Sequence, residues 1–434
     1  MKPAALGAED AAWLHMEDAD NPMVVNVLIE LAGTIEPDAV HRLMDRLTAD
    51  SRFRSIVTES PLHLGRPSWK PHAGFDLDRH IKHVRLGNVS DEALRSFVGR
   101  VVSKCLPLDR PLFRLYVMER EGKGTTLLFR CHHAIADGFG LLGLLLTSAL
   151  GEIDVPRPSR QTHAKAANGY LSSLVRLVTL PSDPPTSLKA PLGEHKRVAW
   201  SRPLLLAALR RMGAPASATI NDVIVALIAG ALRRHLLDRE DVDCLTVRAM
   251  VPVNLRPPNA KLELGNRFGL VVLPLPIGIV DPIARIAAVR DAMLRLKGSR
   301  EPVVSRAVLA LMGRAPSFVE DVGVSFFSKK ASLVLSNVPG PRRKFRLGGV
   351  PVERVIFWVP QSGKMGLGIS VFSYAGTVTV GVIADSHALP YPTLLVKDLE
   401  DEVESIEREL ASTIVAPSEL LQSNVSSDDV RSHR

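Results

Sequence analysis

The sequence predicts an α/β protein of the α+β type, made of two halves that each combine a sheet with helices. Three observations lead to this fold class. Strand-like and helix-like apolar patterns alternate up to about residue 150, a proline-rich stretch at 156–191 interrupts them, and a second mixed set follows. At 434 residues, the chain is also longer than a single core normally supports. We therefore expect two sheet-and-helix domains with a cleft between them.

The first half opens with a strand expected at 24–29. A helix over 37–47 follows, because a proline at its start suits the first helical turn. Ser90 is a good N-cap for a helix whose apolar side chains recur at helical spacing. An apolar strand then ends at His133, and an apolar helix begins near Gly140.

The second half mixes helices and strands without a fixed repeat. Helices are expected from Pro203 onward and over 221–236, 282–296, 305–314 and 392–410. Strands are expected at 245–251, 269–273, 332–337, 355–359, 367–372 and 377–383.

These patterns divide the chain into an N-terminal half over 1–155, a crossover linker over 156–198 and a C-terminal half over 199–412. The linker holds six prolines and one short apolar helix near 171–180. Residues 413–434 are rich in serine and aspartate, so we expect a disordered tail there.

The charge of the chain excludes some partners. The net charge is +8, but the basic residues are scattered and only 5% of residues are aromatic, so a nucleic-acid groove is not expected. Weak attraction to anionic lipid or to the phosphates of a ligand explains the excess. The most apolar run, 139–150, is too short to span a bilayer, and no apolar signal core opens the chain. We expect a cytoplasmic protein, with peripheral attachment to the inner membrane or to lipid inclusions as an open alternative.

Three widely spaced cysteines, Cys105, Cys131 and Cys244, predict neither a disulfide framework nor a metal site. Cys131 would share a strand face with His133, which allows a Cys-His nucleophile as one interpretation. We favour a small buried apolar side chain, because free cysteine is among the most buried residue types.

The candidate catalytic motif is His132-His133-Ala134-Ile135-Ala136-Asp137-Gly138. An imidazole titrates near neutral pH and can act as a general base. Side chains alternate along a strand, so only one histidine can face a given cleft, and we assign His133. Asp137 is expected to fix the local geometry, and Gly138 to allow a turn that a Cβ would obstruct. The alternative is a core or solvated histidine pair beside a turn.

This spacing resembles the His-His-x-x-x-Asp-Gly signature of the CoA-dependent acyltransferase superfamily, which includes chloramphenicol acetyltransferases and peptide-synthetase condensation domains. Further segments, in order from about 10 to 410, are similar to the bacterial wax ester synthase/diacylglycerol acyltransferase family. They include Ala11-Ala12-Trp13, Arg110-Pro111-Leu112-Phe113, Thr219-Ile220-Asn221-Asp222-Val223, Val251-Pro252-Val253-Asn254-Leu255-Arg256, Leu264-Gly265-Asn266-Arg267 and Ser336-Asn337-Val338-Pro339-Gly340-Pro341. Phe113 replaces a tryptophan, and Glu194-His195 stand in a run that the family has richer in arginine, which puts substrate choice in doubt more than catalysis.

The resemblance implies two chloramphenicol acetyltransferase-like domains with the active site in the cleft between them. It implies transfer of a long-chain acyl group from acyl-CoA to a fatty alcohol or a diacylglycerol, giving wax esters or triacylglycerol. His133 would deprotonate the hydroxyl and then protonate the CoA thiolate. No metal, cofactor or acyl-enzyme is required, because a thioester is already activated. Two alternatives stay open: another acceptor (an isoprenoid, a sterol, or a short or branched alcohol), and a catalytically idle lipid-binding protein.

The supporting residues each have a structural alternative. Asn221 and Asp222 either cap a helix or take part in catalysis. The resemblance makes Asn266 and the Asn221 region candidates for the donor to the oxyanion. Arg256 is expected either to pair with Asp137 or to lie solvated at the surface. Asn337 either binds substrate, bonds a crossing strand, or belongs to a structural turn.

Overall fold

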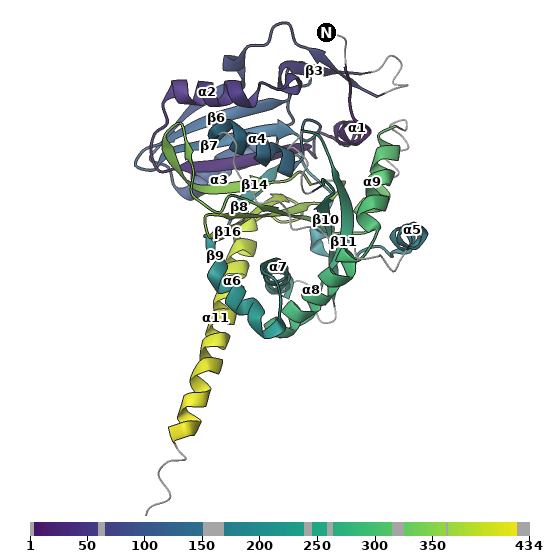
Figure 1. Cartoon of the computed structure of the whole chain (residues 1–434), viewed down its shortest axis with the longest axis vertical. Helices are drawn as coiled ribbons and strands as arrows, with labels where there is room; N and C mark the ends of the chain where they lie inside the picture. Colours follow the sequence, from purple (N-terminus) through teal and green to yellow (C-terminus); the bar gives the residue numbers. More distant parts are fainter. Residues whose placement is uncertain are drawn as a thin grey trace, which may run out of the picture.

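The computed structural model describes residues 4–59, 66–150, 169–237, 245–257, 264–314, 325–361 and 363–422. Two large sheets dominate it, stacked one above the other (Figure 1). The first sheet has six strands in the order β13 (Arg346–Leu347), β14 (Val350–Trp358), β2 (Val24–Leu31), β7 (Gly124–His132), β6 (Phe113–Arg120) and β5 (Ile81–Gly87). All its neighbours are antiparallel except β5 and β6, which are parallel.

The second sheet follows the order β11 (Phe268–Leu275), β10 (Val247–Asn254), β12 (Leu333–Pro339), β15 (Leu367–Tyr374), β16 (Thr377–Asp385) and β8 (Lys196–Trp200), and β9 (Leu204–Leu205) also pairs with β16. Strand β12 runs parallel to both β10 and β15. A small third sheet joins β1 (Ala4–Ala5), β4 (Ser68–Pro71) and β3 (Ser55–Thr58).

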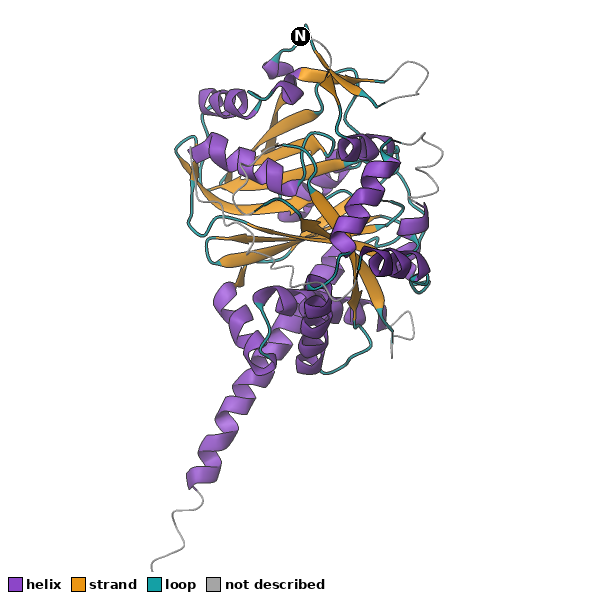
Figure 2. Ribbon diagram, turned by 45° about the vertical axis from the view of Figure 1, so that its right-hand side comes forward, coloured by secondary structure: helices purple, strands orange, loops and turns teal. Residues whose placement is uncertain are grey.

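The α-helices around these sheets are α1 (Ala8–His15), α2 (Pro37–Leu47), α3 (Asp91–Val102), α4 (Gly138–Leu150), α5 (Tyr170–Thr179), α6 (Leu206–Gly213), α7 (Ile220–Leu237), α8 (Pro282–Lys297), α9 (Glu301–Met312) and α11 (Pro392–Gln422). Helices α2 and α4 cover one face of the first sheet, and α3 packs on its other face beside β8. Helices α6, α7 and α8 cover the far face of the second sheet, and α11 projects away from the body (Figures 1 and 2).

The alternation of apolar side chains in β2 explains this layering. Val25, Val27 and Ile29 belong to the core under α2 and α4, whereas Leu28 belongs to the core shared with α3 and β8. Both faces of the strand are therefore buried, and the first sheet lies between a helical layer and the second sheet.

The structure departs from the expected division of the chain at β14. This strand comes from the C-terminal half, yet it pairs with β2 in the first sheet through contacts such as Phe357 with Val27. Periodicity indicates a strand but not the sheet that it joins, because the choice depends on contacts far apart in sequence. Strand β8 likewise begins inside the expected linker, at Lys196.

Two further expectations concern the ends of segments. Helix α11 continues to Gln422, beyond the expected end at 410 and into the expected tail, because residues such as Ala411, Glu419 and Leu420 are good helix formers. The rest of that tail, 423–434, lies outside the described residues, as do the last residues of the expected N-terminal half with the start of the linker, 151–168, and Cys244.

Among the residues described, no single helix is long and apolar enough to cross a membrane. In the described part of the chain, one pair of helices, Leu206–Ala216 and Ile220–Leu237, meets those criteria when taken together, and it is bent by 89° at its junction.

Candidate active site

His133 lies directly after β7, where neighbouring backbone and rings fix its position. Its backbone N–H donates to the carbonyl of Met23 at 2.8 Å, and its own carbonyl accepts from Asn266 Nδ2 at 2.8 Å. The imidazole stacks on Trp13, with 4.0 Å between ring centroids, and meets Phe268 edge-on at 5.9 Å. The ring is therefore held by two aromatic side chains from separate segments.

Burial sets the protonation state of His133. Its loss of hydration lowers the pKa to about 4, against the opposing effect of the Asp137 charge, which favours the protonated ring. The imidazole is thus neutral at neutral pH, and Nδ1 is buried without a hydrogen-bond partner. A neutral, preorganised imidazole is the form that can accept a proton from a hydroxyl.

His132 lies in a different environment, as strand alternation predicts. It is fully buried, its Nδ1 accepts from the backbone N–H of Ala134 at 3.0 Å, and its Nε2 lies 3.4 Å from Glu17 Oε2. Cys131 is also fully buried, and burial raises the pKa of its thiol. A neutral, enclosed thiol is a poor nucleophile, so the apolar interpretation of Cys131 holds.

Asp137 ties the histidine loop to the C-terminal half. Its Oδ1 accepts from the backbone N–H of Gly140 at 2.8 Å, within the first turn of α4. Its Oδ2 accepts from Arg256 Nη1 at 2.7 Å and from the Arg267 N–H at 3.1 Å. The expected Arg256–Asp137 pair is therefore present and almost completely buried. These bonds hold the end of the loop that carries His133.

Gly138 does not form the turn that a Cβ was expected to obstruct. A Cβ at this position would approach Val338 Cγ2 to 3.6 Å, which is ordinary van der Waals contact, and Gly138 begins α4 without a positive φ. The sharp turn that was expected to require a glycine is instead the first turn of a helix capped by Asp137.

Asn266 positions the motif. Its Nδ2 donates both to the His133 carbonyl and to Asp10 Oδ1, the latter at 2.8 Å, and its backbone N–H donates to the same carboxylate oxygen at 3.0 Å. Both side-chain N–H groups are thus engaged, which leaves no donor for an oxyanion. Burial raises the pKa of Asp10, and the Asn266 bonds lower it. The sequence alone does not single out Asp10, because acidic residues are common in the first turn of a helix, where they interact favourably with the helix dipole.

The side chains of Asn221, Asp222 and Asn337 have partners other than His133. Asp222 accepts from the backbone N–H and the hydroxyl of Thr219, in a capping arrangement at the start of α7. Asn337 Nδ2 donates to Asn221 Oδ1 at 2.6 Å. Because alternate residues of β12 face α7, this pair is on the α7 side of the second sheet, whereas Val338 packs in the core with α4.

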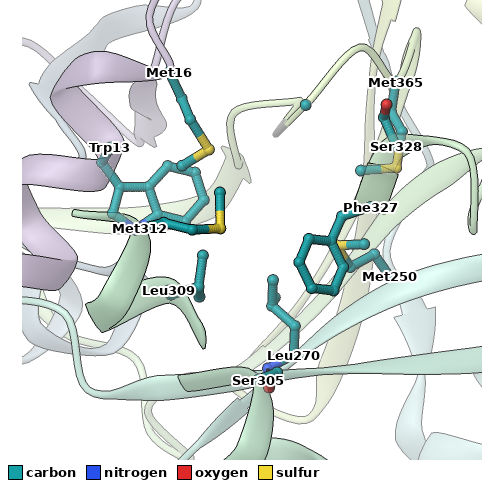
Figure 3. A pocket seen from close by; sticks show the side chains of 11 residues that line it. Trp13, Met16, Met250, Leu270, Ser305, Leu309, Met312, Phe327, Ser328 and Met365 are labelled. Atoms are coloured by element: carbon teal, nitrogen blue, oxygen red, sulfur yellow. The ribbon is translucent and has the colours of Figure 1, made fainter. Parts of the chain in front are cut away.

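An apolar pocket borders Trp13, the ring on which His133 stacks. Trp13, Met16, Leu309 and Met312 form one side of it, and Met250, Phe327 and Met365 face them (Figure 3). Polarizable, flexible methionines adapt to varied apolar shapes. These side chains come from α1, α9, β10 and three other segments, so periodicity did not reveal them.

A second apolar cavity lies between α4 and the two sheets, beside the start of the helix that Asp137 caps. Leu142, Leu145, Val338, Phe357 and Phe372 are among the side chains that line it. Within the described parts of the chain, no group of three or more histidine, cysteine, aspartate or glutamate side chains is arranged to hold a metal ion.

Comparisons with known proteins agree with this geometry. The chain matches the model of the wax ester synthase/diacylglycerol acyltransferase catalytic domain over residues 6–177 and the WS/DGAT C-terminal domain over 264–407. A putative diacylglycerol O-acyltransferase of Mycobacterium tuberculosis is 26% identical, over 89% of this chain and 86% of its own. A probable diacylglycerol O-acyltransferase of the same species is 24% identical, over 91% and 94%.

Solved structures show the same fold. The wax ester synthase/diacylglycerol acyltransferase from Marinobacter aquaeolei VT8 superposes with a TM-score of 0.67 at 20% identity, over 94% of this chain and all of that one. The first condensation domain of the CDA synthetase gives 0.62 at 17% identity, over 93% and 96%. The expected two-domain, chloramphenicol acetyltransferase-like fold is confirmed. The catalytic-domain match includes His133, and the two matches together cover most of the chain, so this chain belongs to the wax ester synthase/diacylglycerol acyltransferase family.

Proposed function

We propose that this enzyme transfers a long-chain acyl group from acyl-CoA to the hydroxyl of a fatty alcohol or a diacylglycerol. The observation that carries the proposal is the neutral, buried His133, held against Trp13 at the edge of an apolar pocket. The pocket suits an aliphatic chain, and the imidazole suits the hydroxyl that must be deprotonated. The family match supports the acyltransferase chemistry.

The proposed reaction needs only one proton carrier. His133 takes the proton of the acceptor hydroxyl while the oxygen attacks the thioester carbonyl carbon. The carbon–sulfur bond then breaks, and the imidazolium returns the proton to the departing CoA thiolate. Asp137 is the charged group that favours the protonated ring during this exchange. The steps require neither a metal nor a cofactor, because the thioester supplies the activated acyl group.

The direct test measures release of free thiol from palmitoyl-CoA, with hexadecanol, a diacylglycerol, a sterol and a short branched alcohol as separate acceptors. We expect acceptor-dependent release with hexadecanol or the diacylglycerol, and its loss in His133→Ala. Turnover with only the sterol or the short alcohol would assign a different acceptor. No release with any acceptor would favour the lipid-binding alternative.

Peripheral binding to lipid is the second part of this proposal, and one helix supports it. Helix α5 exposes a row of large apolar side chains, namely Tyr170, Leu171, Leu174, Val175 and Val178. The helix packs on α9, which contributes Leu309 and Met312 to the apolar pocket. Arg300 lies over the Tyr170 ring at 5.1 Å, while Glu301 nearby is buried. Arg176 of the same helix pairs with Glu301 at 3.1 Å, so the half-buried Arg300 is the cation beside this face. An exposed apolar helix face next to a cation suits the surface of an anionic bilayer.

A further inference from the structure

A polar cavity separate from the apolar pockets lies between α3, β8 and the start of α11. Arg95 and Arg100 line it from α3, and Arg197 lines it from β8, with His195 beside them. No feature of the acyl-transfer chemistry described above uses these side chains. Their convergence from separate segments is the first sign of a binding site.

These three arginines are not neutralised by the protein. Within the part of the chain that the structure describes, none of them forms an ion pair with a carboxylate, and Nε of Arg95 is buried with no acceptor. The Arg95 guanidinium lies over the Trp200 ring at 5.1 Å, which holds it in place. A buried donor without an acceptor is costly unless a ligand supplies one.

The remaining charges at the cavity leave it basic. Lys196 is already paired with Asp385, at 2.6 Å and out of contact with solvent. Glu92 is the carboxylate that lines the cavity, against three free guanidinium groups. Helix α11 begins here, and Thr393 in its first turn lines the cavity, so the positive end of the helix dipole adds to the same field.

The cavity is connected to the catalytic motif by a short series of contacts. Ser103, on the cavity wall, accepts from the Lys196 N–H at 2.8 Å. Two residues further on, the thiol of Cys105 donates to the carbonyl of Asp18 at 3.4 Å. The adjacent Glu17 lies 3.4 Å from His132, next to the proposed base. The segment 103–105 therefore joins the wall of the basic cavity to the segment 17–18, which contacts His132 at the end of β7.

We propose that this cavity binds the phosphate-bearing nucleotide end of acyl-CoA, with the pantetheine arm leading to His133. Arginine forks pair with phosphate oxygens in a bidentate manner, and three of them match a ligand that carries a diphosphate and a phosphomonoester. The inference rests on the proposed function, because it names the part of the chain that recognises the acyl donor. An anionic lipid headgroup has the same phosphate chemistry, and the tests below separate the two sources.

The kinetic test compares two acyl donors that differ only in the nucleotide: palmitoyl-CoA and palmitoyl-pantetheine. The variant Arg95→Gln/Arg197→Gln removes two cavity charges, and Arg42→Gln/Arg46→Gln on α2 removes two exposed charges elsewhere as the matched control. We expect KM for palmitoyl-CoA to rise about tenfold or more in the cavity variant, with kcat retained. With palmitoyl-pantetheine, the cavity variant, the control and the wild type should have equal kcat/KM.

Equal changes with both donors, or no change with palmitoyl-CoA, would overturn the proposal. Loss of binding to anionic vesicles in the cavity variant, with its preference between the two donors unchanged, would assign the cavity to a lipid headgroup and overturn it equally.

Calorimetric titration with CoA itself does not depend on turnover. The wild type and the α2 control should bind CoA, and the cavity variant should bind it at least about tenfold more weakly. An intact melting transition of the variant separates this loss from unfolding. Equal CoA affinity in all three proteins would refute the site. CoA binding at the cavity without any acyl transfer would refute the proposed function and leave the site standing.

Discussion

Arg256, which lies just after β10, donates a 2.7 Å hydrogen bond to Asp137, so a buried ion pair joins the two halves directly at the catalytic loop. The same carboxylate caps α4 through Gly140. Because Asp137 also favours the charged form of His133, one side chain couples the docking of the halves to the basicity of the proposed base.

Replacing Asp137 by asparagine should weaken both stability and turnover. The substitution leaves the Arg256 charge buried without its partner, and removing one member of a buried pair typically costs about 3 kcal/mol. Thermal melting and thiol release, measured on the same preparation, check this. A double variant with Arg256→Gln should recover part of the lost stability. Unchanged melting with complete loss of turnover would instead make Asp137 a group that acts on the substrate.

Replacing His133 by alanine should lower acyl transfer by roughly 100-fold or more, which is the usual contribution of a general base. The fold should survive, because the backbone bonds of residue 133 to Met23 and Asn266 do not involve the ring that is removed. His132→Ala is the matched comparison, and it should mainly reduce stability, since His132 bonds Ala134 in a closed environment. Rates normalised to folded protein distinguish the two, and a reversed ranking would make His132 the base.

The rate should show no titration near the ordinary histidine pKa of 6.5. Burial lowers the pKa of His133 to about 4, so the neutral base persists as the pH falls and is lost only as the pH approaches that value. A profile of kcat/KM against pH should therefore be flat down to about pH 5. A clear inflection between pH 6 and 7 that disappears in His133→Ala would contradict the buried, neutral state.

The same pKa shift has a consequence for stability. The unfolded chain binds a proton at this histidine below pH 6.5, whereas the folded protein does not do so until about pH 4. The free energy of unfolding should accordingly decline as the pH falls through that window. Denaturant titrations at several pH values should show a smaller decline in His133→Ala than in the wild type. An identical decline in both would remove His133 as its cause.

Lipid binding should depend on the exposed face of α5. Leu171→Gln/Val175→Gln should reduce co-flotation with anionic vesicles, because both side chains are at least half exposed and apolar. Leu205→Gln/Val280→Gln, at exposed apolar positions elsewhere, is the matched control. Binding should weaken as salt shortens the Debye length below about 8 Å. No flotation of the wild type at any salt concentration would end the membrane proposal without affecting the acyltransferase.

The catalytic strand was predictable because its information is local. Alternation along β7 separates His132 from His133, and an aspartate four residues after the base suits a helix cap. The parts that sequence reasoning missed are long-range. Trp13 reaches His133 from α1, and Asp10 reaches Asn266 across more than half of the chain. Periodicity carries no information on such contacts, and it cannot show that the N–H groups of Asn266 are already engaged.

The pairing of β14 with β2 has a consequence for how the chain is made. Strand β2 ends at Leu31, and the strand that covers its outer edge begins about 300 residues later, at Val350. At about 5–20 residues per second, a ribosome takes roughly 15–60 s to deliver it. During that interval, the nascent first sheet exposes an unpaired, apolar edge, which is the kind of surface that invites strand exchange with neighbouring chains. We therefore expect the yield of folded protein to depend on chaperones that cover the β2 edge during synthesis. Fragments that end before β14 should aggregate.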